Sequence, residues 1–306
     1  MAYLKTVLLS KEEEDLIHDK SIECLQDVGI RVDSESVLEL LEKEGASVDY
    51  ENYLAKIPVK MVNQALETVP KEFTLCGRDP KHDLEIPTRS YPYATTNGLA
   101  PFVNDYETGE YRLSTRKDLA SFTRLGDALD SIDFLWTSLS PTDVPPVAEG
   151  PHTLWATMQN TSKHVQCVAV QSAEAARIQI ELAALIAGGK EELKKRPIFS
   201  MIVCPIAPLS FEKHAIESQV EFARAGVPVV GLAMPSGGMS APVTIAGMML
   251  TANAENLASL VITQAAAPGA PHIFRTESTP MNMVDGSFNY EAPEFGLIFS
   301  GMGQMT

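Results

Sequence analysis

The chain is poor in cysteine, and its few thiols follow no known pairing pattern. Among 306 residues there are only four, and no two of them form a CxxC pair: Cys24, Cys76, Cys167 and Cys204. None lies near a histidine at the spacing of a zinc site, and the N-terminus shows no secretion signal. These absences argue against a disulfide scaffold and a zinc protein. They predict a cytoplasmic protein with reduced thiols and no metal bound by this chain.

Basic residues and long apolar runs are also scarce. Lysine and arginine total 24 against 40 acidic residues, a formal net charge of −16, which argues against nucleic acid or an anionic membrane as a main partner. The most apolar stretch, residues 227–261, is interrupted by Pro235, Pro242 and Asn253. A membrane helix needs about 20 predominantly apolar residues, so we expect no membrane span.

Residues 1–90 have the pattern of a mainly helical cap. Ser10 and Glu13 fit a capping box at the start of a first helix, and Gly29 fits its C-terminal stop. A second helix is predicted near residues 34–44, and a third between Pro58 and Pro70. A polar, proline-rich stretch then reaches residue 90, which we take as the boundary of this domain.

From residue 91 to residue 306 the pattern changes to alternating strands and helices. The predicted strands are short, continuous apolar runs, as buried parallel strands should be. They span residues 93–96, 134–139, 165–170, 198–203, 227–233 and 272–276. The helices between them cover residues 115–128, 149–160, 173–187, 211–225 and 243–266, and another starts near Pro293.

This alternation predicts a (β/α)8 TIM barrel. The alternative is a doubly wound open sheet, but no GxGxxG motif follows the first strand. Six units are present where an eight-stranded barrel has eight, so we expect a barrel truncated after about six strand–helix units. Two unpaired parallel edges would then be exposed.

In a barrel the functional side chains follow the strands at their C-terminal ends. We therefore select Asn97, Gln171, Cys204, Met234, Glu277, Phe288 and Tyr290 as candidate substrate-binding residues. Asn97 beside a glycine also fits a simple turn, and Cys204 also fits a small buried hydrophobe. No catalytic residue is predicted, because neither a GxSxG motif nor a metal-ligand spacing of the six histidines is present.

The loop after the sixth strand carries the most suggestive of these residues. A carboxylate such as Glu277 is costly to bury at a barrel mouth without a positively charged partner. The ring faces of Phe288 and Tyr290 attract cations by about 0.5–2 kcal/mol. The three together suit a cationic substrate such as a quaternary ammonium, although each is also compatible with a structural role.

Five strings of the chain are distinctive: MPSGGMSAPVTIAGMMLTANAENLASLVITQAAAPGAP at residues 234–271, NTSKHV at 160–165, CPIAPL at 204–209, QVEFARAGVPV at 219–229 and YATTNG at 93–98. Together they resemble the trimethylamine methyltransferase family. The N-terminal helices fit as well, so the similarity covers the whole chain in order. Members of that family are barrels of well over 400 residues, and the resemblance therefore implies that the C-terminal third is missing.

The resemblance also implies a chemistry. Members of the family move a methyl group from a methylated amine to Co(I) of a corrinoid, which a separate small protein carries and presents at the barrel mouth. The enzyme then positions the amine and excludes water, and it needs no nucleophile of its own. Trimethylamine and a quaternary amine such as glycine betaine both remain possible substrates. The pyrrolysine of the trimethylamine enzymes would lie beyond Thr306. We also expect a homo-oligomer.

Two other functions remain open from the sequence. One is a different barrel enzyme, such as a lyase or a decarboxylase. The other is an inactive fragment that only binds the corrinoid protein or small amines. An assay of methyl transfer to reduced cobalamin separates both from a methyltransferase.

Overall fold

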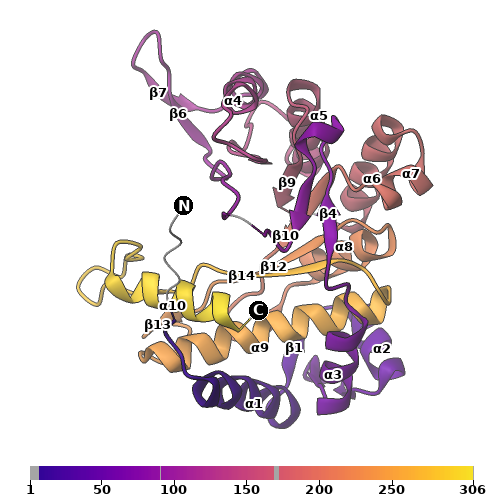
Figure 1. The fold of residues 1–306 in the computed structure, drawn as a ribbon, viewed down its shortest axis with the longest axis vertical. Helices are drawn as coiled ribbons and strands as arrows, with labels where there is room; N and C mark the ends of the chain where they lie inside the picture. Colours follow the sequence, from indigo (N-terminus) through magenta and orange to yellow (C-terminus); the bar gives the residue numbers. More distant parts are fainter. Residues whose placement is uncertain (1–6, 90, 169–171, 306) are drawn as a thin grey trace.

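A parallel sheet of five strands forms the centre of the fold. The computed structural model describes residues 7–89, 91–168 and 172–305 (Figure 1). The strands are β8 (Leu135–Trp136), β9 (Val165–Val168), β10 (Phe199–Val203), β12 (Val229–Ala233) and β14 (His272–Thr276). They lie side by side in chain order, and every neighbouring pair is parallel. A doubly wound sheet reverses its strand order at a switch point, and this sheet has no such reversal.

The first predicted strand is present only as isolated bridges. Thr95 pairs with Phe134 and Ala100 with Leu139, both in the parallel sense. Hydroxyl groups complete the contact, because the Trp136 amide donates to Thr95 Oγ1 at 3.0 Å and Thr96 Oγ1 donates to the Trp136 carbonyl at 2.6 Å. Side chains therefore replace ladder hydrogen bonds at this edge, so the prediction of a regular strand over residues 93–96 was wrong.

Helices cover one face of the sheet. They are α4 (Arg116–Ala128), α5 (Glu149–Asn160), α6 (Ala173–Ala187), α7 (Lys190–Lys195), α8 (Lys213–Arg224), α9 (Ile245–Ala266) and α10 (Pro293–Gln304), with a short 3-10 turn η2 (Pro146–Ala148) before α5. Alternate strand residues such as Phe199, Met201 and Val203 pack against them in one buried cluster. The other set, including Ile202 and Leu232, forms a separate cluster on the inner face.

The N-terminal residues form the three predicted helices, α1 (Lys11–Asp27), α2 (Glu35–Glu44) and α3 (Val59–Thr68). They also form strands that the pattern did not predict: β1 (Ile30–Val32), β2 (Ser47–Asp49), β3 (Leu54–Lys56), β4 (Phe73–Leu75) and β5 (Leu84–Ile86). The first three join β11 (Ser210–Phe211) in a four-stranded sheet. This part of the chain thus combines the three predicted helices with short strands that the pattern did not show.

Helix α9 is the central helix of the fold. It is long and apolar enough to cross a membrane by length and composition, but 78% of its most apolar window is buried inside the protein. Figure 1 shows it between the sheet and the N-terminal helices, and it contacts α1, α2, α3, α8, α10 and β12. Its apolar character is that of a core helix, since it is enclosed on almost every side.

The β4–β5 hairpin, with the short 3-10 turn η1 (Pro80–His82), covers the amino ends of the central strands. The Cys76 amide donates to the Pro197 carbonyl at 3.1 Å, and the Cys76 carbonyl lies 2.9 Å from His164 Nδ1. Arg196 bonds both oxygens of Asp83 at 2.8 and 2.9 Å. Burial lowers the pKa of His164 to about 4, so the ring is neutral. This end is closed, and the opposite, carboxyl end is where a ligand can approach.

Candidate functional site

An ion pair stacked on a tryptophan lies at the carboxyl end of the sheet. Arg275, on β14, donates from Nη2 to Glu277 Oε1 at 2.7 Å. The guanidinium carbon lies 4.7 Å from the centroid of the Trp136 ring on β8. The side chains of Arg275 and Glu277 are 26% and 20% exposed, so solvent still reaches both charges. The arrangement offers one positive group, one negative group and an aromatic face on the inner side of the sheet.

Cys204 and Met234 line the same inner face. Both are half-buried and pack against the cluster that contains Trp136, Ile202 and Val230. Burial and then the charge of Glu277 raise the pKa of Cys204 to about 12, while Arg275 lowers it. The thiol is therefore protonated at neutral pH and is a poor nucleophile, in line with the alternative of a small hydrophobe.

The two predicted aromatic residues are neighbours in space. The Phe288 and Tyr290 ring centroids lie 6.1 Å apart, and Tyr290 meets the edge of Phe295 at 5.6 Å. Burial and then the charge of Glu277 raise the pKa of Tyr290, which places the phenol within electrostatic range of that carboxylate. Phe288 and Tyr290 remain 55% and 45% exposed. The loop thus brings Phe288 and Tyr290 together, and the role of Glu277 and both rings in binding stays a prediction.

The remaining two candidates lie apart from this group. Asn97 is exposed, and its Oδ1 accepts the amide of Gly98 at 3.0 Å, which is the simple turn that its sequence context also allowed. Gly98 itself packs closely, because a Cβ there would lie 2.4 Å from the Thr137 carbonyl oxygen. Gln171 lies outside the described residues.

Arg275 and Trp136 were not among the candidates. Arg275 lies inside a predicted strand, where a charged residue is unusual unless it has a partner. Trp136 lies in the second predicted strand. The signal for both is the alternation of strand side chains, because residues two apart share a face. That places Arg275 and Glu277 on one side of β14.

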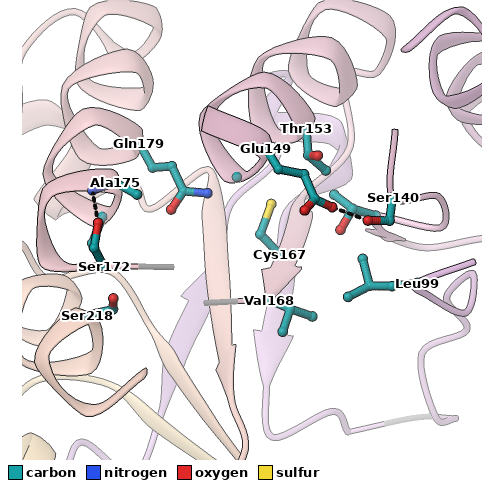
Figure 2. Close-up of a pocket in the computed structure, with 13 residues that line it drawn as sticks. Leu99, Ser140, Glu149, Thr153, Cys167, Val168, Ser172, Ala175, Gln179 and Ser218 are labelled. Atoms are coloured by element: carbon teal, nitrogen blue, oxygen red, sulfur yellow. Dashed lines mark hydrogen bonds between the residues drawn. The ribbon is translucent and has the colours of Figure 1, made fainter. Parts of the chain in front are cut away.

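A cavity of about 220 Å³ lies on the other side of the same sheet edge, between the ends of β8 and β9 and the helices α5 and α6 (Figure 2). None of the seven candidates is among its described lining residues. Glu149, in the first turn of α5, accepts a short hydrogen bond from the Ser140 hydroxyl. The cavity therefore has an acidic rim that the sequence pattern did not reveal.

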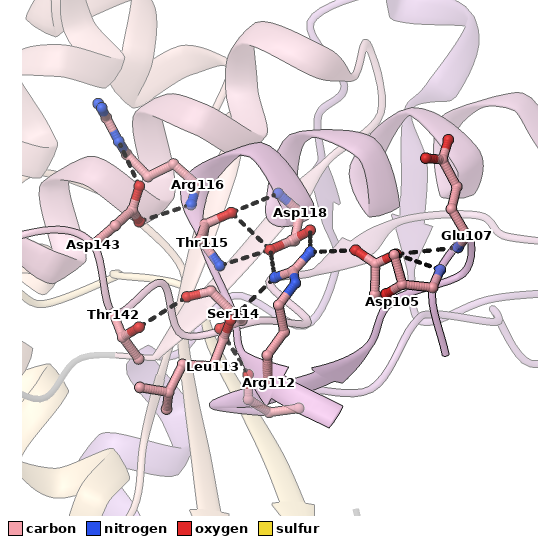
Figure 3. Close-up of polar contacts among 12 residues, drawn as sticks. Asp105, Glu107, Arg112, Leu113, Ser114, Thr115, Arg116, Asp118, Thr142 and Asp143 are labelled. Atoms are coloured by element: carbon pink, nitrogen blue, oxygen red, sulfur yellow. Dashed lines mark hydrogen bonds and ion pairs between the residues drawn. The ribbon is translucent and has the colours of Figure 1, made fainter. Parts of the chain in front are cut away.

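A projecting hairpin follows the Thr95 bridge at the carboxyl end. It consists of β6 (Phe102–Asn104) and β7 (Tyr111–Leu113). Arg112 braces it by donating to Asp105 at 2.8 Å and to both oxygens of Asp118 on α4 at 2.8 and 2.9 Å (Figure 3). Hydrogen bonds from Arg112 and neighbouring amides lower the pKa of Asp105 to about 2. An ion-pair network thus fixes the hairpin to the body of the protein.

Two further short strands complete this end of the fold. They are β13 (Ser236–Gly237) and β15 (Thr279–Pro280), which pair in parallel. They hold the loop after β12 against the loop after β14. Within the residues described, no group of three or more histidine, cysteine, aspartate or glutamate side chains is arranged to hold a metal ion.

Comparison with known proteins decides the family. The chain matches the family described as trimethylamine methyltransferase (MTTB) over residues 2–306. The chain belongs to the trimethylamine methyltransferase family. Among the relatives in this family, the trimethylamine methyltransferase of Desulfitobacterium hafniense is 34% identical over 97% of the chain, and that of Methanosarcina thermophila is 31% identical over 98%. The glycine betaine methyltransferase of Desulfitobacterium hafniense is 27% identical over 98%.

The chain spans only 60–62% of the length of these trimethylamine methyltransferase family relatives. Solved structures support the fold. The monomethylamine methyltransferase of Methanosarcina barkeri superposes with a TM-score of 0.57 at 14% identity, and a hydroxylamine complex of MtmB does so with the same score at 15%. Each match covers 98% of this chain and 66% of the other.

Proposed function

We propose that this chain transfers a methyl group from a methylated amine to the cobalt of a corrinoid that a separate small protein carries. The observation that supports it most is the Arg275–Glu277 pair on Trp136, at the open end of a sequentially ordered parallel sheet. Family membership supports the reaction class. We also propose that the five strands and the Thr95 bridge are an arc of an eight-stranded barrel, whose mouth is the site.

The charges at this mouth favour a substrate that carries both signs. Glu277 already has Arg275 as a partner, so a simple cation would have to compete with the guanidinium. A zwitterion can meet both groups, its ammonium facing Glu277 and its carboxylate facing Arg275. We therefore propose a quaternary amine with a carboxylate, of the glycine betaine kind. Trimethylamine is the second candidate, because the 34% identical relative carries that name.

Each residue has a distinct task in this proposal. Glu277 attracts the quaternary nitrogen, which cannot donate a hydrogen bond, and the Tyr290 ring offers it a negative face. Arg275 fixes the substrate carboxylate, and Trp136 holds the guanidinium in place by stacking. The bound substrate is thereby oriented with a methyl group toward the mouth. Orientation and removal of water are the main contributions a protein can make to such a transfer.

The corrinoid supplies the nucleophile when its carrier protein docks at the mouth. The residues described there fit a site that binds the substrate and leaves the nucleophile to the corrinoid. The Cys204 thiol is protonated, and the charged pair serves to bind and not to attack. We propose that the carrier approaches beside the β6–β7 hairpin, which projects at this end (Figure 1). A cytoplasmic location and a homo-oligomeric state remain part of the proposal.

The test compares two variants by calorimetric titration with glycine betaine and with tetramethylammonium. Glu277→Gln removes the negative charge and should weaken binding of both by about 1–3 kcal/mol. Arg275→Met keeps the apolar stem and should weaken binding of glycine betaine by at least about tenfold while leaving tetramethylammonium unchanged or tighter. Arg224→Met, at an exposed position on α8, is the control.

Methyl transfer to reduced cobalamin is then measured for the same proteins. The zwitterion proposal fails if Arg275→Met binds glycine betaine as well as the unchanged chain does. The amine site as a whole is wrong if Glu277→Gln alters neither ligand. Loss of transfer with unchanged binding would show that the pair acts on the reaction and not on substrate recognition.

A further inference from the structure

The cavity behind the sheet edge is built by five elements that meet at the carboxyl end. Residues from the ends of β8 and β9, the N-terminal halves of α5 and α6, and Ser218 of α8 surround about 220 Å³. One water molecule takes up about 30 Å³ of liquid volume, so the space exceeds a single ordered water several-fold. Cys167, which packs in the cluster on the helix-covered face, lines it, whereas Arg275 and Glu277 are not among its described lining residues.

Two buried polar side chains in this cavity have no hydrogen-bond partner among the residues that the structure describes. Gln179 of α6 is 4% exposed, its amide extends into the cavity in Figure 2, and it makes no hydrogen bond to any residue that the structure describes. The Thr153 hydroxyl of α5 is 6% exposed and is equally unpartnered within the described residues. Buried amides and hydroxyls are nearly always hydrogen-bonded in folded proteins. Both groups therefore point to a ligand or to ordered water.

The charge of the lining is negative. Glu149 contributes a carboxylate that the Ser140 hydroxyl holds in place. No lysine, arginine or histidine is among the described residues that line the cavity. The net charge of −16 adds to the local preference for a cation. A ligand here meets a carboxylate, an amide oxygen and hydroxyl oxygens, all of which accept hydrogen bonds.

We propose that this cavity binds a small protonated amine that retains at least one N–H group. Hydrogen-bond acceptors arranged around a carboxylate bind a cation more tightly when that cation can donate hydrogen bonds. A quaternary ammonium has no N–H and cannot satisfy the Gln179 or Thr153 oxygens. The cavity should therefore favour protonated amines that carry an N–H group, whereas the aromatic inner face should favour quaternary amines.

This assignment rests on the proposed function only in naming the physiological ligand. Removal of one methyl group from a quaternary amine leaves a tertiary amine, which acquires an N–H when it is protonated in water. The cavity would then hold the product beside the mouth and separate it from the quaternary substrate. Small-amine binding to the cavity can be measured without a corrinoid or a carrier protein.

The experiment titrates the chain with dimethylammonium and with tetramethylammonium chloride and follows binding by saturation-transfer NMR. Dimethylammonium should bind at least about tenfold more tightly. Glu149→Gln should reduce its affinity at least about tenfold, and Thr153→Val, which keeps the side-chain shape, should reduce it by a smaller factor. Glu174→Gln is the matched control, because Glu174 is an exposed acid in the first turn of α6 that does not line the cavity.

Thermal unfolding of each variant shows whether it has folded, and Thr153→Val provides a second reading if Glu149→Gln is unstable. Equal affinity for the two cations, or an unchanged affinity in both cavity variants, overturns the proposal. If Glu277→Gln and not Glu149→Gln abolishes dimethylammonium binding, the amine binds at the inner face. That result would support the proposed function and refute the second site. Absence of any binding would mean that water alone fills the cavity.

Discussion

Glu255 should make the stability of the folded chain fall as the pH rises, and glutamine in its place should remove that dependence. The residue lies on α9 and is fully buried. Its Oε1 accepts the Leu209 amide at 2.9 Å, and its Oε2 has no partner among the described residues. Burial raises the pKa of Glu255 to about 7, although the Leu209 hydrogen bond lowers it. A carboxylate is therefore costly at this position.

The size of the effect follows from the two pKa values. The folded value is about 7 and the ordinary value is 4.5, so the neutral form is favoured by folding. The stabilising contribution is complete below pH 4.5 and is lost as the pH rises through 7. Linkage then gives a loss of about 3 kcal/mol at pH 8 relative to the acidic limit, and of roughly 2–3 kcal/mol between pH 5 and pH 8.

Urea unfolding at pH 5, 6, 7 and 8 measures this loss. Glu255→Gln keeps an oxygen acceptor for the Leu209 amide and removes the charge. Its free energy of unfolding should therefore not fall between pH 5 and pH 8 as that of the unchanged chain does. The pH dependence is the reliable signal, because the new amide also leaves a buried donor unpaired, which costs about 1–3 kcal/mol at every pH.

His164 and His272 act in the opposite direction. Burial lowers their pKa values to about 4 and about 3, so they destabilise the fold as the pH falls below 6.5. The contribution of these two histidines is the same in the unchanged chain and in Glu255→Gln, so it cancels when the two are compared. Glu67→Gln, an exposed position on α3, is the control. Parallel curves for the unchanged chain and Glu255→Gln would refute the reasoning.

Three further predictions concern the carboxyl end. Arg112→Gln should speed amide hydrogen exchange in the β6–β7 hairpin, since Arg112 joins Asp105 to Asp118; unchanged exchange there would show that the strands hold the hairpin alone. In the unchanged chain the hairpin amides should stay protected from hydrogen exchange at pH 4 and lose this protection only toward pH 2. The reason is that the pKa of Asp105 is lowered to about 2, so its ion pair with Arg112 persists at pH 4. Gly98→Ala should lower the free energy of unfolding by about 1–3 kcal/mol, since a Cβ would lie 2.4 Å from the Thr137 carbonyl oxygen; urea unfolding with an unchanged midpoint would contradict the close packing.

The helices around the sheet could be predicted from local signals. The bounds predicted for α5 and α6 agree with the structure at both ends, because their apolar periodicity is long. At α1 the capping box of Ser10 and Glu13 is also confirmed. Helix boundaries depend on residues three or four apart, which a single sequence displays directly.

The short N-terminal strands had no comparable signal. β1 has three residues, and its parallel partner β11 lies far along the chain, with Arg31 opposite Ser210. Three residues show no usable alternation, and a pairing over that separation is set by tertiary packing. The prediction of a strand over residues 93–96 was wrong for a different reason. Thr95 and Thr96 bond Trp136 through their side-chain hydroxyls and not through a regular backbone ladder.

The candidate site was predictable in part. Glu277 and Tyr290 belong to one loop, so their proximity followed from the position of that loop after a strand. The pairing of Glu277 with Arg275 could not be predicted. Arg275 looks like a charged interruption of an apolar strand until the inward face of β14 is known. The cavity was not predictable, since Glu149, Thr153 and Gln179 come from two helices whose mutual packing the sequence does not specify.

The Arg275–Glu277 pair changes what each group can do. Alone, a carboxylate beside aromatic rings would select for positive charge and little else. With Arg275 at 2.7 Å, the mouth is close to neutral, and a cation gains little by displacing the guanidinium from both the carboxylate and the Trp136 face. In the proposed site, a ligand that supplies both charges offsets the loss of the Arg275–Glu277 pair, because it forms two new ion pairs. In the proposed function, selectivity for a zwitterion would therefore arise from the pairing within the protein and not from either residue by itself.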